Sequence, residues 1–213
     1  MCVFLPTVLV DVALWLVGRR CRLCWLKLLH AASQPVGLLD RDVERSLEWS
    51  RQQVPRRFEL QPGMARLDRQ LVPPINDRSW RMNAQLREVQ PDACGIVVAC
   101  GSRFGGYQLH CQNNMVVFTY AVHESLMHRL EIALPLGDAL LEVTFARTGE
   151  RSGQFDLWAN GSHAGSAQVK RTWLIFGMTG GLTCGHGNIP VTDECLPPNT
   201  LNGLSLEKVV IEV

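Results

Sequence analysis

The sequence predicts a mainly β protein, an antiparallel two-sheet sandwich preceded by a helical leader and an extended linker. Three observations support this fold class. Apolar and polar residues alternate with a period of two from Trp80 onward, which is typical of strands that bury one face. Turn residues recur at intervals of about 8 to 12 residues, as expected of an antiparallel sandwich. Two proline-containing breaks, at 61–63 and 72–74, precede the first alternating segment.

The chain is expected to divide into three parts. Residues 1–35 form an apolar and basic leader, and residues 36–78 contain a helix followed by the extended linker. Helical character is found at 21–33 and 41–53, where the second segment sets an apolar face against a charged one. The β-domain is expected to occupy residues 79–213.

The leader raises the question of membrane insertion. Residues 1–17 are rich in valine and leucine, but Asp11 and Pro6 interrupt them, so the free energy of insertion is close to zero. The run is shorter than the ~20 residues that cross a bilayer, and its arginines follow it, whereas a secretory signal places positive charge first. We therefore expect a cytoplasmic chain. Its leader is expected to be non-native sequence, translated from upstream of a truncated gene and without a function. A weak membrane anchor is the alternative.

The first strands of the β-domain follow from its apolar pattern. Alternation from Trp80 to Arg87 predicts a strand with one buried face. The continuous apolar run Ile96 to Cys100 predicts a strand buried on both faces. Glycines at 101–106 let the chain turn back, and Asn113-Asn114 marks the tip of the next hairpin because asparagine tolerates left-handed backbone.

The second half of the domain continues the pattern. Alternating residues predict strands at 130–134, 141–145 and 155–157, separated by turns. Asn160-Gly161 is the strongest hairpin signal in the chain. A closing strand is expected from Leu206 to Val213, with a bulge near Lys208.

Composition excludes several classes of partner and cofactor. The net charge is only +1, so the charge balance gives no indication that the chain binds nucleic acid. The eight cysteines follow no disulfide framework, and we expect reduced, mostly buried thiols. The pairs Cys21–Cys24 and Cys184–His186 lack the further ligands that a structural zinc needs. We therefore expect no metal and no cofactor on this chain.

Four segments, in order, resemble the C-terminal β-domain region of bacterial arylsulfatases. They are the linker Pro55 to Trp80, the loop Gly101 to Leu109, the hairpin Gln154 to Thr172, and the closing part from Gly187 to Val213. The resemblance covers about residues 36–213. It implies a C-terminal accessory domain of a sulfuric ester hydrolase, truncated and without its catalytic domain.

The resemblance also implies that the chain is inactive alone. Sulfatases convert the Cys or Ser of a Cys/Ser-x-Pro-x-Arg run to formylglycine and hold a calcium ion with carboxylates. Here Cys195 to Asn199 ends in asparagine, and Ser33 to Gly37 ends in glycine, so both lack the arginine. We expect no catalytic or metal-binding residue on this chain, and a buried role for Cys195. Formylglycine and calcium belong to the intact family enzyme, and its catalytic domain is the implied partner.

One loop carries the candidate docking residues that the resemblance implies. These residues are Arg103, Phe104, Gly105, Gly106 and Tyr107. In an intact sulfatase the loop is expected to face the catalytic domain. The guanidinium of Arg103 can satisfy several carbonyls or a carboxylate at once, so we expect a structural or docking role for it.

A concanavalin-like carbohydrate-binding module is the alternative function. The predicted architecture is similar to concanavalin and laminin-G jelly rolls, and such sandwiches often bind sugars through exposed aromatic residues and a loop metal. The aromatic side chains available for stacking are Tyr107, Tyr120, Trp158 and Trp173. The acidic pair Asp193-Glu194 has too few oxygens for calcium. Exposed, coplanar aromatic rings on one sheet face would favour this alternative.

Overall fold

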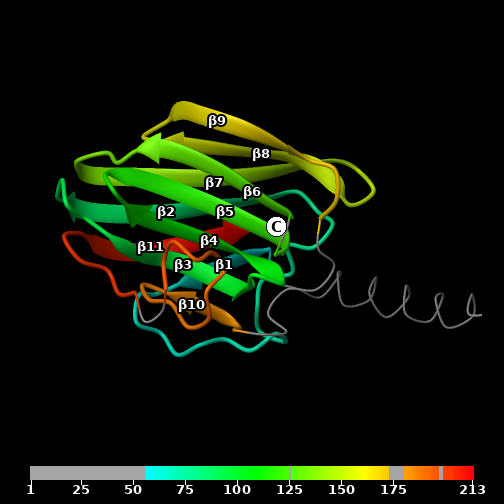
Figure 1. The fold of residues 1–213 in the computed structure, drawn as a ribbon, viewed down its shortest axis with the longest axis horizontal. Coiled ribbons are helices and arrows are strands. Elements are labelled where there is room, and N and C mark those ends of the chain that lie inside the picture. Colours follow the sequence, from blue (N-terminus) through cyan, green and yellow to red (C-terminus); the bar gives the residue numbers. More distant parts are fainter. Residues whose placement is uncertain (1–55, 125, 173–179, 197–198) are drawn as a thin grey trace, which may run out of the picture. The chain divides into compact units, whose positions relative to one another are not determined.

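The computed structural model describes residues 56–124, 126–172, 180–196 and 199–213 (Figure 1). These residues form eleven strands and contain no helix. The helices expected at 21–33 and 41–53, and the apolar run at 1–17, lie outside the described residues. Within the described part, no helix has the length and apolarity needed to cross a membrane.

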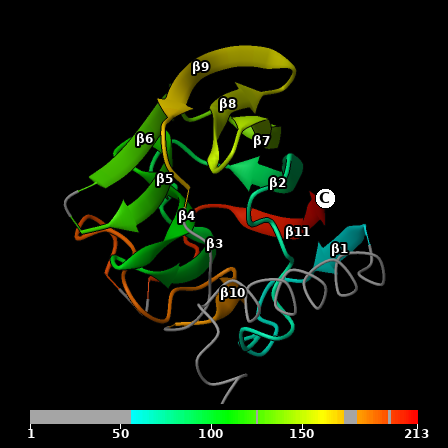
Figure 2. The same ribbon diagram turned by 90° about the vertical axis from the view of Figure 1, so that its right-hand side faces the viewer.

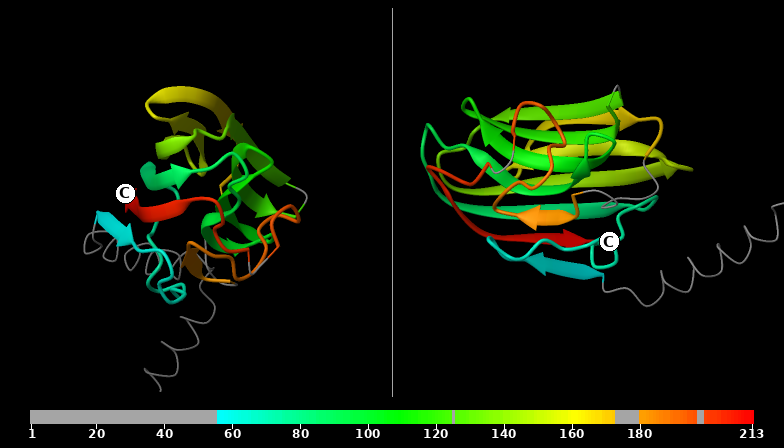
Figure 3. Two further views of the ribbon diagram at one scale, coloured as in Figure 1. Left: turned by 90° about the vertical axis from the view of Figure 1, so that its left-hand side faces the viewer. Right: turned by 60° about the horizontal axis from the view of Figure 1, so that its bottom comes forward.

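The strands form two antiparallel sheets that face each other (Figure 2; Figure 3, left). In spatial order, sheet A contains β1 (Arg57–Leu60), β11 (Ser205–Glu212), β2 (Trp80–Val89), β7 (Gly137–Gly149), β8 (Ser152–Ala159) and β9 (Ser162–Val169). Sheet B contains β10 (Leu182–Cys184), β3 (Gly95–Ser102), β4 (Gly105–Gln112), β5 (Met115–His123) and β6 (Leu126–Ala133). Every neighbouring pair of strands is antiparallel. The predicted two-sheet β architecture is confirmed.

The core lies between the two sheets and is centred on Phe155 of β8. Its ring centroid lies 4.7 Å from that of Phe145 and 5.8 Å from that of Trp80, both on sheet A. From sheet B, the rings of Tyr120 and Phe118 approach it at 4.8 Å and 5.3 Å. Aromatic pairs at these separations contribute attraction beyond the apolar area that they bury. The cluster therefore ties the two sheets together.

The predicted turns and the bulge are confirmed. Asn113 and Asn114 join β4 to β5 with φ values of 52° and 59°. Asn160 and Gly161 join β8 to β9 with φ values of 48° and 77°. Both pairs have the left-handed backbone that two-residue hairpins require. The register of β11 against β2 shifts between Leu206 and Lys208, where the bulge was expected.

The segment predicted as an extended linker also contributes to the sheets. Residues 57–60 are extended, but they form strand β1, which pairs with β11 from Arg57↔Glu212 to Leu60↔Val209 (Figure 3, right). Farther along, Leu67 forms an isolated bridge with Leu182 of β10. An extended linker and an edge strand have the same backbone conformation, so the sequence pattern alone does not distinguish one from the other.

Candidate functional site

The Gly101–Gly106 loop is a tight hairpin between β3 and β4. Arg103 and Phe104 occupy its tip, and the Phe104 ring is 62% exposed. The Arg103 guanidinium pairs with Asp193 at 3.0 Å and with Glu124 at 3.4 Å, and its backbone N–H donates to the Pro190 carbonyl. The described partners of Arg103 thus lie within the domain.

The glycines of this loop are required by the hairpin itself. A Cβ added to Gly101 would lie 2.2 Å from the Gly105 carbonyl oxygen, and one added to Gly106 would lie 2.3 Å from the Cys100 carbonyl oxygen. Such contacts are far shorter than van der Waals separation, and the atoms met are backbone. Two strands that approach this closely need glycine whatever the ancestry of the protein.

Two of the aromatic residues considered for sugar stacking are in the core. Tyr107 is fully buried and Tyr120 is 2% exposed, because both point from sheet B toward Trp80 and Phe155. Trp173 lies outside the described residues. Trp158 is half-buried on the outer face of sheet A, so it is the one candidate that the structure leaves on a sheet face.

The cysteines and acidic residues singled out in the sequence have structural surroundings. Cys195 is buried against Ile96 and Ala99 of β3, and burial raises the pKa of its thiol to about 11. Cys184 is buried in the core, while His186 lies 3.2 Å from its carbonyl oxygen. Among the described residues, no group of three or more potential ligands could hold a metal ion.

Polar side chains surround Trp158 on strands β8 and β9. The register places Trp158 beside His163, Asp156 beside Ser166, and Gln154 beside Gln168. The Trp158 and His163 rings meet edge to face with centroids 4.6 Å apart. We call this surface the Trp158 patch; it consists of Gln154, Asp156, Trp158, His163, Ser166 and Gln168.

Asp156 is the centre of the hydrogen-bond network in the Trp158 patch. Its Oδ1 accepts from Gln154 Nε2 at 2.8 Å, from the Ser166 hydroxyl, and lies 3.3 Å from His163 Nε2. Burial acts to raise the pKa of Asp156, but the hydrogen bonds from Ser166, Gln154 and His163 outweigh it and lower that pKa. Asp156 is therefore an ionised carboxylate held in a fixed orientation, with 17% of its side chain exposed.

Further polar residues lie beside the Trp158 patch, on β7 and β2. Trp158 pairs with Glu142 of β7, and Glu142 pairs with Asn83 of β2. The Glu142 carboxylate lies 3.6 Å from the Arg81 guanidinium. None of these polar residues is among those predicted from the sequence, although a signal exists: they occupy the outward positions of their strands, as Trp158 does.

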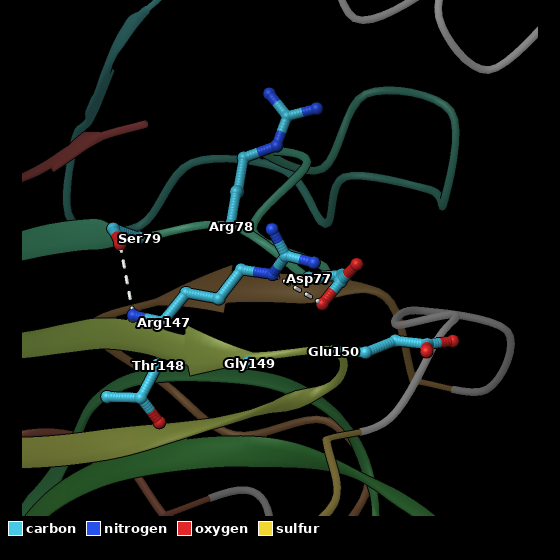
Figure 4. A pocket seen from close by; sticks show the side chains of 7 residues that line it. All are labelled: Asp77, Arg78, Ser79, Arg147, Thr148, Gly149 and Glu150. Atoms are coloured by element: carbon cyan, nitrogen blue, oxygen red, sulfur yellow. Dashed lines mark hydrogen bonds and ion pairs between the residues drawn. The ribbon is translucent and has the colours of Figure 1, made fainter.

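A second hollow, the Arg147 pocket, lies where the β7–β8 turn meets the segment before β2 (Figure 4). It has a volume of about 490 Å³. Asp77 Oδ1 accepts from Arg147 Nε and from the Arg151 backbone N–H, both at 2.9 Å, and Ser79 Oγ accepts from the Arg147 N–H. None of the seven described residues that line the pocket is aromatic, and the charges of Arg147 and Asp77 neutralise each other in an ion pair. These contacts anchor the β7–β8 turn to the start of β2.

No protein-family model and no curated protein matches this chain in sequence. Solved structures match it in fold. A structure of botulinum neurotoxin type C, described as depending on interaction with two ganglioside molecules to enter cells, aligns with a TM-score of 0.50 and 15% identity over 73% of this chain and 39% of its own. The binding domain of botulinum neurotoxin serotype D/C aligns with a TM-score of 0.47 and 15% identity over 63% of this chain and 33% of its own. The chain thus spans about two fifths or less of the length of these structures.

The predicted membership of the arylsulfatase family is wrong, and with it the function as a sulfatase accessory domain. The structure that aligns with a TM-score of 0.50 is that of a botulinum neurotoxin, and no family model and no curated protein supports a sulfuric ester hydrolase. The physical reason lies in the motifs themselves. The glycine loop and the Asn-Gly hairpin are residues that tight turns demand in any antiparallel sandwich, so they identified the fold and not the family.

Proposed function

We propose that this β-domain binds carbohydrate and that the Trp158 patch is its binding surface. The observation that carries the proposal is the placement of Trp158 on an outer sheet face, beside a fixed carboxylate, an imidazole, a hydroxyl and two amides. Sugars present an apolar face of C–H groups and a rim of hydroxyls. A surface that offers both an aromatic plane and fixed hydrogen-bonding groups is suited to both parts.

The fold supports the same class of ligand. Two antiparallel sheets packed face to face are an architecture that hosts many sugar-binding sites. The neurotoxin structure that aligns with a TM-score of 0.50 belongs to a protein described as interacting with gangliosides, which are glycolipids. This analogy concerns the class of ligand, whereas the residues come from the surface of this chain.

The groups of the Trp158 patch have distinct roles in the proposal. A sugar ring stacks on the exposed part of the indole, next to the His163 edge. Asp156 accepts hydrogen bonds from ring hydroxyls, and charge-assisted bonds of this kind are stronger than neutral ones. Gln154 and Ser166 hold the Asp156 carboxylate in place before the ligand arrives, so little rotamer entropy is lost on binding.

A glycan array followed by calorimetric titration tests the proposal. The full chain is applied to the array, and the glycan with the highest signal is titrated into the wild type and into two variants. Trp158→Ala is expected to weaken binding by at least about tenfold, the effect typical of an aromatic contact residue. Leu140→Ala is the matched control, because Leu140 is 40% exposed on the same face of sheet A but outside the Trp158 patch.

Two results would overturn the proposal. One is the absence of glycan binding by the wild-type chain at millimolar concentrations. The other is equal affinity of the wild type and Trp158→Ala, with circular dichroism showing that both are folded. Asp156→Asn is a second test variant, since it keeps the shape of the side chain and removes its charge. We expect it to bind the glycan more weakly and to keep the circular dichroism spectrum of the wild type.

A further inference from the structure

The carboxylate of Asp156 has one oxygen atom that its neighbours leave open. All three of its described contacts, with Gln154, His163 and Ser166, end on Oδ1. Oδ2 is not among the buried polar atoms of the described residues that lack a partner, so it reaches solvent. The side chain lies on the outer face of sheet A, as Trp158 does two residues later, and it is 17% exposed. Oδ2 is therefore the carboxylate atom available to a ligand beside the indole.

The hydrogen bonds around Asp156 run in one direction, toward its carboxylate. Gln168 Nε2 donates to Gln154 Oε1, and Gln154 Nε2 in turn donates to Asp156 Oδ1 at 2.8 Å. The Ser166 hydroxyl also donates to Oδ1. These donors are already used, whereas Oδ2, the lone pairs of the Ser166 oxygen and the electron-rich face of the Trp158 ring remain. The strongest group left for a ligand is an acceptor, and it fits a ligand that donates hydrogen bonds.

The charge around Trp158 is negative. The indole lies between Asp156 on its own strand and Glu142, its neighbour on β7. The Glu142 carboxylate lies 3.6 Å from the Arg81 guanidinium, which compensates its charge. Asp156 forms no ion pair with the described lysines and arginines; its partners are an amide, a hydroxyl and the His163 imidazole. As long as that imidazole is neutral, one negative charge stays uncompensated beside the ring.

The basic residues at the ends of β8 and β9 are too distant to compensate this charge. Arg151 precedes Asp156 by five residues along the chain, and Lys170 follows Ser166, the cross-strand partner of Asp156, by four. At about 3.3 Å per residue, these separations correspond to roughly 16 Å and 13 Å. Salt screens exposed charges beyond about 8 Å at physiological ionic strength. The field that a ligand meets beside Trp158 is therefore set mainly by Asp156.

We propose that the Trp158 patch binds sugars that carry no acidic group, and that Asp156 determines this specificity. The inference rests on the function proposed above for this patch. The hydroxyl of a neutral sugar donates its hydrogen to Asp156 Oδ2 while the C–H face of the ring stacks on Trp158. A ligand carboxylate or sulfate has no hydrogen to donate and is repelled. For a ligand anion about 6 Å from Asp156, at an effective dielectric constant of about 40, Coulomb's law gives about tenfold weaker binding.

Glycans that differ by one acidic group test the specificity. The full chain is applied to an array on which each glycan core occurs in a neutral, a sialylated and a sulfated form. The neutral glycan with the highest signal and its acidic forms are then titrated by calorimetry at pH 8. We expect the wild type to favour the neutral form about tenfold, and Asp156→Asn to lose most of this ratio. Asp92→Asn, a change at an exposed carboxylate between β2 and β3, keeps the ratio.

A salt series with the wild type tests whether the preference is electrostatic. In about 1 M sodium chloride the screening length falls to about 3 Å, so we expect the preference for the neutral form to fall at least threefold. This measurement needs no variant, so it remains decisive if Asp156→Asn does not fold. A preference that persists in high salt would show that the shape of the acidic group, and not its charge, is rejected.

The outcomes distinguish this specificity from the binding function itself. Equal or tighter binding of the acidic forms by the wild type overturns the specificity and leaves carbohydrate binding at the Trp158 patch intact. An unchanged ratio in folded Asp156→Asn overturns the role of Asp156. The absence of binding to every glycan overturns the proposed function, and the specificity with it.

Discussion

His110 makes the stability of the fold depend on pH between about 4 and 6.5. Burial lowers the pKa of this imidazole from 6.5 to about 4, with the Glu194 carboxylate acting in the opposite direction and Arg129 in the same one. The folded state therefore binds fewer protons than the unfolded state between these values. The contribution of His110 to the free energy of unfolding is therefore complete above pH 6.5 and is lost as the pH falls toward 4.

The size of the effect follows from the interval between the two pKa values. Each pKa unit corresponds to about 1.4 kcal/mol, so the whole interval amounts to about 3 kcal/mol. Between pH 7 and pH 5, about 2 kcal/mol of this is lost. The Glu194 pKa is lowered by its hydrogen bond with Arg129, so that carboxylate loses its contribution only below this window.

Urea denaturation at a series of pH values measures the effect. Wild type and His110→Gln are compared between pH 7 and pH 5, since glutamine keeps a polar group beside Gln108 but does not titrate. We expect the variant to lose most of the pH dependence, whatever its stability at pH 7. Gln85→Ala, which removes no titratable group, is expected to retain the wild-type slope. Parallel slopes for wild type and His110→Gln would refute the reasoning, as would a measured His110 pKa near 6.5.

Three further changes test the packing. Gly106→Ala is expected to cost about 3 kcal/mol or more, because the new Cβ meets the Cys100 carbonyl at 2.3 Å, whereas Gly165→Ala, with its nearest contact at 3.8 Å, serves as a mild control in thermal melts. Phe155→Ala is expected to lower the free energy of unfolding in urea by about 3–5 kcal/mol, since the ring joins both sheets. Arg103→Ala is expected to cost at most about 1 kcal/mol, because Glu124 and Asp193 are 60% and 80% exposed; a larger loss would show that this ion pair network is stronger than its exposure indicates.

Local patterns predicted the elements of this fold well. Trp80 starts β2, and the run at 96–100 lies in a fully buried strand. Asn113-Asn114 and Asn160-Gly161 form hairpins where expected. These features depend on backbone sterics and on the two-residue period of a strand, which are readable within a few residues. For the same reason they carry little information about family, and the sulfatase resemblance failed.

The candidate site and the buried polar residues of sheet B depend on contacts between distant segments. In strand β4, Gln108 and His110 lie on the face of sheet B away from the core, yet they are buried because residues 188–196 cover them. The sequence of β4 itself contains no sign that a distant segment covers this face. Likewise Asp156 acquires its partners from β9 across a hairpin, and the choice of Trp158 over Tyr107 and Tyr120 follows from which face of each strand meets the core.

The pairing of β11 between β1 and β2 has a consequence for the order of folding. Arg57 and Glu212 are 155 residues apart in the chain, yet they are neighbours in sheet A. During synthesis β2 has β7 available on one side but no partner on the other until β11 has emerged. At 5–20 residues per second, the interval between these strands lasts roughly 6–25 s, and contacts of such sequence separation form slowly. Sheet A therefore exposes an open edge to chaperones and to other nascent chains for seconds in every round of translation.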